Sequence, residues 1–180
     1  MQVEQKKQAD AYTAIQVVYT KTTADIAAKT TLVGTYTAAE KAEQAKLVTA
    51  QATVTDATAK AAAAKKIVAT LTSLIPALKE AAAKSDLAVA QAKTDQQLVA
   101  AVTQLKVIVA AREATFAAST KAATTETARL KTAQALVVAT QGAIATAKTN
   151  LANTQKAITA LKATMTAQQA QVAAAKAATD

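Results

Sequence analysis

Few side chains in this sequence could carry out catalysis or bind a metal. The 180 residues include no histidine and no cysteine, so the commonest general base, the thiol nucleophile and the soft metal ligands are missing. Gly34 and Gly142 are isolated, which leaves no glycine-rich loop to cradle a phosphate. Glu40 and Glu43 are a close carboxylate pair on one helical face and could approach a cation. We interpret them instead as polar residues of a helical seam, and predict no enzyme, no catalytic residue, no metal site and no cofactor.

The composition predicts a few long helices. The chain contains 53 Ala and 30 Thr but only 2 Gly and 1 Pro, although loops normally need glycine and proline for their backbone angles. One Phe, three Tyr and no Trp supply little bulk for a wide core. A thin interface between closely packed helices is therefore expected.

Apolar residues recur every seven positions in two segments. In the first segment, one column steps from Tyr12 to Val89, with Glu40 as its clear exception, and a companion column steps from Ile15 to Ala92. In the second segment, the columns run from Val102 to Val172 and from Leu105 to Ala175. Two apolar columns in strict heptads are the signature of a coiled coil.

The two segments are out of phase, because Val89 and Val102 are 13 residues apart, one short of two heptads. Thr94 and Gln97 have the spacing of a capping box, and Asp95 suits the positive end of a new helix. The fold class predicted is all-α: a long antiparallel coiled-coil helical hairpin forming a single rod over residues 1–180. Its helices span about 3–92 and about 95–178, with a turn at about 92–95.

The predicted turn sets a register in which large residues face small ones. It places Ala57 opposite Leu130 and Leu47 opposite Thr140. Such alternation is what close packing of alanine-rich helices requires.

Pro76, the only proline, leaves two alternatives open. The heptad phase runs through it, which favours a kink in a continuous first helix. Alternatively, Ser73 caps a short separate helix that begins at Pro76 and adds a third helix at the tip.

Charged residues interrupt the seam columns and are interpreted as fixing the register, a known role of buried polarity in coiled coils. They are Lys29, Glu40, Glu43, Arg112 and Glu126.

The net charge of +9 raises the question of nucleic-acid or membrane binding. The 21 basic residues are scattered, with never more than two adjacent, and no aromatic stacking platform accompanies them. The stretch 132–147 is too short and polar to cross a bilayer. We therefore predict no specific nucleic-acid partner and no transmembrane segment.

The apolar face widens toward the turn. Ile67, Leu74 and Ile108 each lie one position before a seam column. They indicate either a better-packed tip or a surface for docking or self-association, and are the candidate interface residues for a homodimer.

The run LTSLIPALKEAAAKSD, followed by heptads rich in Ala, Lys and Thr, resembles alanine-rich coiled-coil segments of large multidomain planctomycete proteins. Those proteins also carry cytochrome-c-like and WD40-type propeller domains. The resemblance implies a spacer beside flanking domains of a larger, extracytoplasmic protein. This chain has neither a haem-attachment motif nor propeller repeats, so no cofactor role follows.

The sequence thus favours a structural spacer or scaffold that presents or links other domains and self-associates. The alternative is a helical module that binds a lipid surface or a polyanion.

Overall fold

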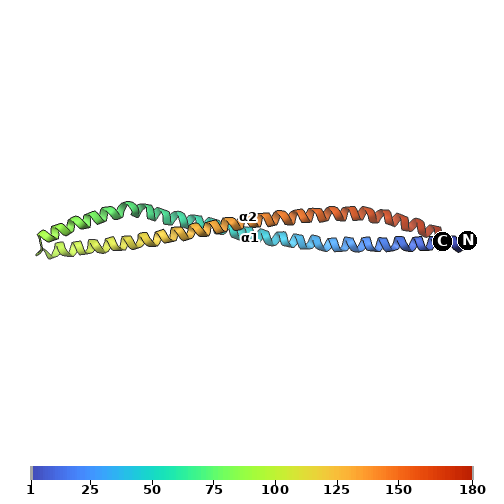
Figure 1. The fold of residues 1–180 in the computed structure, drawn as a ribbon, viewed down its shortest axis with the longest axis horizontal. Helices are drawn as coiled ribbons and strands as arrows, with labels where there is room; N and C mark the ends of the chain where they lie inside the picture. The colour runs from blue at the N-terminus through green and yellow to red at the C-terminus, as the bar shows by residue number, and fades with distance from the viewer. Residues whose placement is uncertain (1, 180) are drawn as a thin grey trace. The chain divides into compact units, whose positions relative to one another are not determined.

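Two long helices make up the protein. A computed structural model describes the backbone of residues 2–179 and the side chains of residues 2–177. Helix α1 spans Gln2–Gln91 and helix α2 spans Gln96–Thr179. They pack against each other as a helical hairpin (Figure 1), which confirms the predicted fold class. Long helices follow from a sequence dominated by the best helix former and nearly free of helix breakers.

The chain divides into two compact units, which are described one at a time. Unit 1 combines Met1–Leu47 with Val138–Asp180, and unit 2 is Val48–Val137. The beginning of α1 and the end of α2 lie together at one end of unit 1 (Figure 1), whereas the turn belongs to unit 2. That the whole chain forms a single rod stays a prediction.

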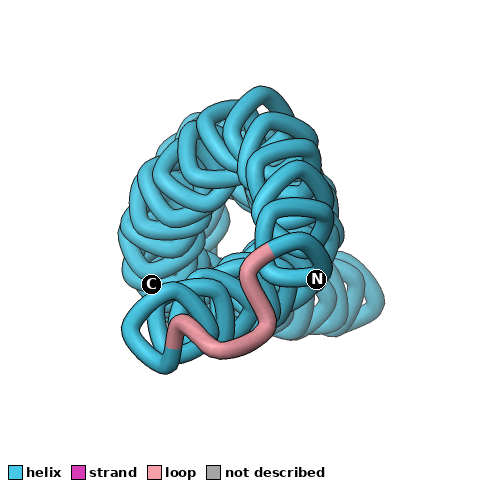
Figure 2. Tube along the Cα trace, turned by 90° about the vertical axis from the view of Figure 1, so that its left-hand side faces the viewer, coloured by secondary structure: helices cyan, strands magenta, loops and turns pink. Residues whose placement is uncertain are grey.

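Four residues, Ala92 to Asp95, join the helices (pink in Figure 2). The Asp95 amide donates to the Ala92 carbonyl at 3.0 Å, which closes the turn, and the Val99 amide begins α2 by donating to the Asp95 carbonyl at 3.1 Å. The Leu98 amide donates to Oδ1 of Asp95 at 3.0 Å. Asp95 is therefore the N-cap, and the predicted Thr94–Gln97 capping box is wrong. An aspartate at this position both accepts from a free amide and places a negative charge at the positive helix end.

Helix α1 continues through Pro76. The alternative of a separate third helix beginning at this residue is therefore wrong. Inside a helix, a proline cannot donate to the carbonyl four residues back, here that of Thr72, and its ring crowds that carbonyl. Just before the proline, the Ser73 hydroxyl donates to the Thr70 carbonyl, three residues back, at 3.0 Å. The local kink stays a prediction.

The heptad columns form the contact between the helices. In α1, every residue of both columns from Tyr12 to Val89 is buried or half-buried. In α2, the same holds from Val102 to Ala175, except for Arg112. Seven of the ten buried apolar residues in the described chain are alanines of these columns, among them Ala57 at 0% exposure. Small side chains allow close approach of the helices but bury little area.

Hydrogen bonds in unit 1 establish the direction and register of the helices. Nε2 of Gln169 donates to the Tyr19 hydroxyl at 2.9 Å, and the Thr23 hydroxyl lies 3.9 Å from Sδ of Met165. Four residues forward along α1 thus correspond to four residues backward along α2, as in an antiparallel pair. The predicted register places Tyr19 opposite Gln168, the neighbour of the residue that it contacts.

Candidate interaction surfaces

The carboxylates of Glu40 and Glu43 are half-buried and engaged with nearby polar groups. Nζ of Lys148, from α2, lies 3.7 Å from Oε1 of Glu40, and the side-chain amide of Gln44 donates to the same oxygen at 3.1 Å. Nζ of Lys46 lies 2.6 Å from Oε1 of Glu43. Across residues 2–179, no group of three or more acidic residues could hold a metal ion. Glu40 therefore contributes to the helix contact through Lys148, whereas Glu43 pairs with a lysine of its own helix.

The other polar residues predicted to lie in the seam differ in their exposure to solvent. Lys29 and Glu126 are half-buried, but Arg112 is exposed, so its predicted place in the seam is wrong. Its neighbour Glu113 is half-buried instead and forms an ion pair with Lys79 of α1. A carboxylate with a partner across the contact costs less to bury than a guanidinium without one, which agrees with the burial of Glu113 in place of Arg112.

Asp56 holds two cations in unit 2. Its Oδ2 lies 3.0 Å from Nζ of Lys60 on the same helix and 2.7 Å from a guanidinium nitrogen of Arg129 on α2. Arg129 also contacts Glu126 at 3.2 Å. The hydrogen bond from Lys60, followed by that from Arg129, lowers the pKa of Asp56 below its ordinary value of 3.8. The hydrogen bond to Asp56, followed by that to Glu126, raises the pKa of Arg129.

In unit 2, one edge of the helix pair is polar. In an antiparallel pair, residues that directly follow the second column of each helix line the same edge. Two ion pairs across this edge bear this out: Lys79 with Glu113, and Lys106 with Asp86 at 2.6 Å. We call this set the polar edge; its residues are Gln51, Thr58, Lys65, Thr72, Lys79, Asp86, Lys106, Glu113, Thr120, Thr127 and Gln134.

The opposite edge of unit 2 has a different composition. It consists of the residues that directly precede the first column of each helix, and we call it the apolar edge. Its residues are Thr53, Lys60, Ile67, Leu74, Ala81, Ala88, Ala101, Ile108, Thr115, Ala122, Arg129 and Leu136. Charges occur only at Lys60 and Arg129, both of which contact Asp56. From Ile67 to Ala122, by way of the turn, the apolar edge carries no charge.

The three candidate interface residues all lie on the apolar edge and are exposed. Ile67 is 45%, Leu74 is 40% and Ile108 is 47% exposed. Leu136, on the same edge, is 51% exposed. The sequence pattern placed the first three one position before a seam column, on an apolar face that widens toward the turn. It left out Leu136, which occupies the same position of the repeat on α2.

The grooves beside the seam are open and offer little chemistry. One of about 590 Å³ lies in unit 2 over Val68 and Ala123, with Lys65 and Lys131 at its sides. The hydroxyls of Thr124 and Thr127 beside it donate to carbonyls of their own helix, at 3.0 and 2.6 Å. The hydroxyl donors of both threonines are therefore occupied, and the floor of the groove is apolar.

One part of α1 has the length and composition of a membrane-crossing helix. An 18-residue window has a mean hydropathy of 1.3, and 17% of it is buried. This measure considers length and composition alone. It bears on the lipid-binding alternative taken up below.

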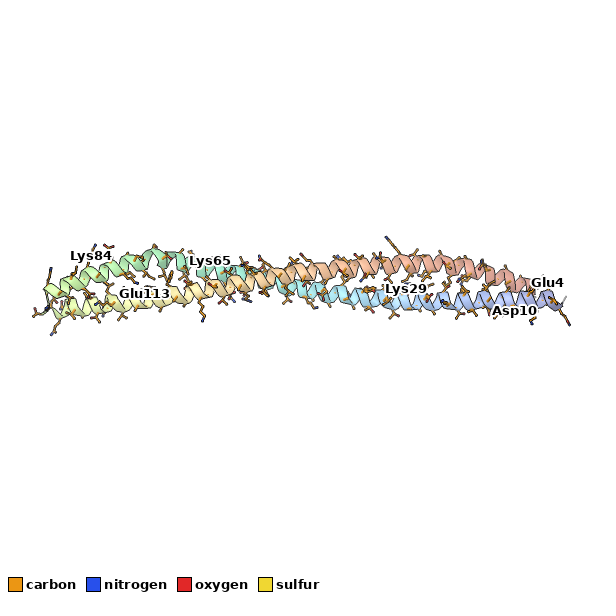
Figure 3. All side chains as sticks on the ribbon, in the orientation of Figure 1. Glu4, Asp10, Lys29, Lys65, Lys84 and Glu113 are labelled. Carbon is orange, nitrogen blue, oxygen red and sulfur yellow. The ribbon has the colours of Figure 1, made fainter. Side chains whose placement is uncertain are left out.

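Side chains cover all sides of both helices (Figure 3). In that view, Lys84 belongs to α1 near the turn, and Glu113 to the facing part of α2. Compared with family models, with curated proteins and with solved structures, the chain matches none. What the protein does must therefore be inferred from the hairpin and its edges.

Proposed function

We propose that the protein is a structural scaffold: a helical hairpin that presents or links the domains joined to it and pairs with a second copy. The observation that supports this most is the buried seam, which runs along both helices in heptad phase. All but one of its positions are buried or half-buried, and the described residues contain no group of three or more acidic side chains that could hold a metal ion. Residues buried between the two helices stabilise the hairpin and are not exposed to a substrate.

The location of the chain ends defines what kind of scaffold this is. Both ends belong to unit 1 (Figure 1), so a domain joined before α1 and one joined after α2 would lie next to each other. The hairpin would hold such domains together rather than apart. The resemblance to extracytoplasmic multidomain proteins supports the presence of such domains, as part of the same proposal.

Reporter domains test this arrangement. A donor and an acceptor fluorescent protein are fused to the two ends of the chain, and energy transfer is measured. We expect efficient transfer that disappears when the hairpin is unfolded in urea. Transfer no greater than in the urea-unfolded protein would overturn the proposal that flanking domains are held side by side.

A second candidate function is binding to a lipid surface. The apolar, mostly unburied window of α1 favours it, and the net charge of +9 would assist binding to anionic headgroups or to another polyanion. Binding to phosphatidylglycerol vesicles and to duplex DNA at about 0.15 M salt separates the two functions. Saturable, salt-sensitive binding in the micromolar range would contradict a purely structural role; no binding is expected.

A further inference from the structure

The apolar edge of unit 2 is bordered by further uncharged residues. Next to it on each helix lies the column two positions after the first seam column. On α1, this neighbouring column holds Ala63, Thr70 and Ala77 between the charged residues Asp56 and Lys84. On α2, it holds Gln104, Ala111, Ala118, Thr125 and Thr132. The one further charge on this side is Arg112, which is exposed. Its long side chain can carry the guanidinium to the rim of the surface while its methylene groups lie along it.

The charges of this part of the chain lie elsewhere. Lys65, Lys79, Lys106 and Glu113 are on the polar edge, and Lys121 is on the outer face of α2. A solvated surface would normally mix both signs of charge on all exposed columns. One charge-free edge beside a strongly charged one makes the hairpin amphipathic across its width.

Helices with apolar residues in the two seam columns alone are typical of two-stranded coiled coils. Helices that add a third apolar column are typical of larger bundles, where each helix contacts two neighbours. Along the apolar edge, Ile67, Leu74 and Ile108 make such a third column beside the seam residues Leu71 and Val109. The pattern of unit 2 is therefore that of a bundle, although the chain supplies only two helices.

The hairpin alone also buries little surface. Its accessible area is 12152 Å², whereas a compact monomer of its mass, 18.3 kDa, would expose about 8,100 Å². No large side chain among the described residues is completely buried. Additional burial of apolar area would stabilise the seam, since the hydrophobic contribution grows in proportion to that area.

We propose that a second copy of this chain packs on the apolar edge of unit 2, so that the two hairpins form a four-helix bundle. This inference rests on the self-association included in the proposed function, and specifies its surface. A second copy fits because an uncharged surface meets its own copy without repulsion, although the chain carries a net charge of +9. The polar edge, by contrast, carries Lys65, Lys79, Asp86, Lys106 and Glu113, whose charges would lose water in such a contact.

The available area agrees with a dimer. The charge-free stretch of α1 covers about 23 residues, which corresponds to about 35 Å of helix, and two adjacent helices are about 20 Å wide. The edge therefore offers about 700 Å² per copy, close to the roughly 800 Å² per partner of a standard stable interface. The new contact would be continuous with the seam, extending one core across four helices.

Sedimentation equilibrium of the full chain tests the proposal. We expect the wild type to have the mass of a dimer at micromolar concentration, and the double variant Leu74→Lys with Ile108→Lys to have that of a monomer. The matched control is Thr72→Lys with Thr120→Lys, which adds the same charge to the polar edge of the same unit. The control should remain a dimer.

A helicity measurement and a second pair of substitutions distinguish loss of the dimer from loss of folding. Far-UV circular dichroism should show unchanged helicity in all variants, because Leu74 and Ile108 are already 40% and 47% exposed. If the lysine variant loses helicity, Leu74→Gln with Ile108→Gln replaces it and should also be monomeric. A wild type that is monomeric at every concentration, or a control that dissociates as fully as the edge variant, would overturn the dimer.

The vesicle measurement separates this failure from that of the proposed function. If the wild type is monomeric and binds neither vesicles nor DNA, the proposed dimer is wrong but the proposed scaffold function is not contradicted. A monomer that binds vesicles, and loses that binding with Leu74→Lys and Ile108→Lys, would assign the apolar edge to lipid. That result would overturn both proposals.

Discussion

Threonine side chains bond to their own helix along the whole described chain. The hydroxyl of Thr13 donates to the Ala9 carbonyl at 3.0 Å and that of Thr103 to the Val99 carbonyl at 2.8 Å, and many others repeat the pattern. Threonine is a mediocre helix former, partly because its hydroxyl competes for backbone groups. Here the hydroxyl shares a carbonyl that is already part of the helix, so its donor is satisfied without breaking the helix. The exposed threonines consequently add little hydrogen-bonding capacity to the surface.

Gln168 is a polar residue in the seam whose side-chain oxygen lacks a hydrogen-bond donor among the described residues. It occupies a column position in unit 1 with 9% exposure, and its Oε1 has no hydrogen-bond partner among the described residues. Gln168→Met keeps the length of the side chain and removes the buried oxygen. We expect the free energy of unfolding to rise by about 1 kcal/mol, measured by urea denaturation.

The matched control for that change is Gln169→Met, which removes the bond to the Tyr19 hydroxyl at an exposed position. It should be neutral or mildly destabilising. If Gln168→Met destabilises the protein as well, the buried amide contributes to the seam and the prediction is contradicted.

The ion pairs of Asp56 make stability depend on pH. Because its pKa is lower in the folded protein, Asp56 stabilises the fold above its ordinary value of 3.8, and this contribution is lost as the pH falls through the lowered pKa. Asp56→Asn should therefore lower the melting temperature at pH 7 and reduce the loss on going from pH 7 to pH 3. Asp25→Asn, at an exposed position of α1, is the control and should follow the wild type. Equal acid sensitivity of the Asp56 variant and the wild type would contradict the assignment.

At the scale of the helices, Pro76 is the clearest defect. It is exposed, so replacing it changes little packing, and alanine would restore the backbone bond to the carbonyl of Thr72. Pro76→Ala should stabilise the protein by up to about 3 kcal/mol. Thermal and urea melts measure the change.

Gly34→Ala is the reference variant, with which the change in stability at Pro76 is compared. An added Cβ at Gly34 would meet nothing within 4 Å, so the expected gain is the helix propensity alone, about 1 kcal/mol. A gain at Pro76 no larger than at Gly34 would mean that the proline imposes no strain on α1. A loss of stability would mean that its fixed backbone angle is useful there.

The helices and their contact could be predicted from the sequence because they depend on repeating patterns. The heptad columns from Tyr12 and from Val102 need only spacing, and they identified nearly every buried position. The wrong predictions concern single positions, where either of two adjacent residues could cap the helix or lie in the seam. The cap is Asp95 rather than Thr94, and Arg112 gives its place to Glu113, because the hydrogen bond or ion pair available depends on coordinates rather than on spacing. The apolar edge was predicted in part, from the position of Ile67, Leu74 and Ile108 beside the seam, whereas the polar edge was identified from the ion pairs between the two helices.

At the scale of the whole molecule, the register itself can be tested, because the chain has no native cysteine to interfere. Thr23→Cys with Met165→Cys places two thiols where the structure shows the side chains in contact. A short bis-maleimide should link them within one chain. In the control, Thr23→Cys with Gln141→Cys, the second thiol is about 36 Å further along α2 and should not be linked. Equal linking of both pairs would contradict the register of unit 1.

The neighbouring chain ends of unit 1 also determine how this hairpin can be combined with other folds. A segment that starts and finishes at adjacent points can be inserted into a surface loop of a host domain, since the host backbone leaves and returns at nearly the same place. The host would keep its own core, and its fold would not depend on the length of the insert. Whole heptads could then be added to or removed from both helices together, changing the reach of the insert while preserving the seam.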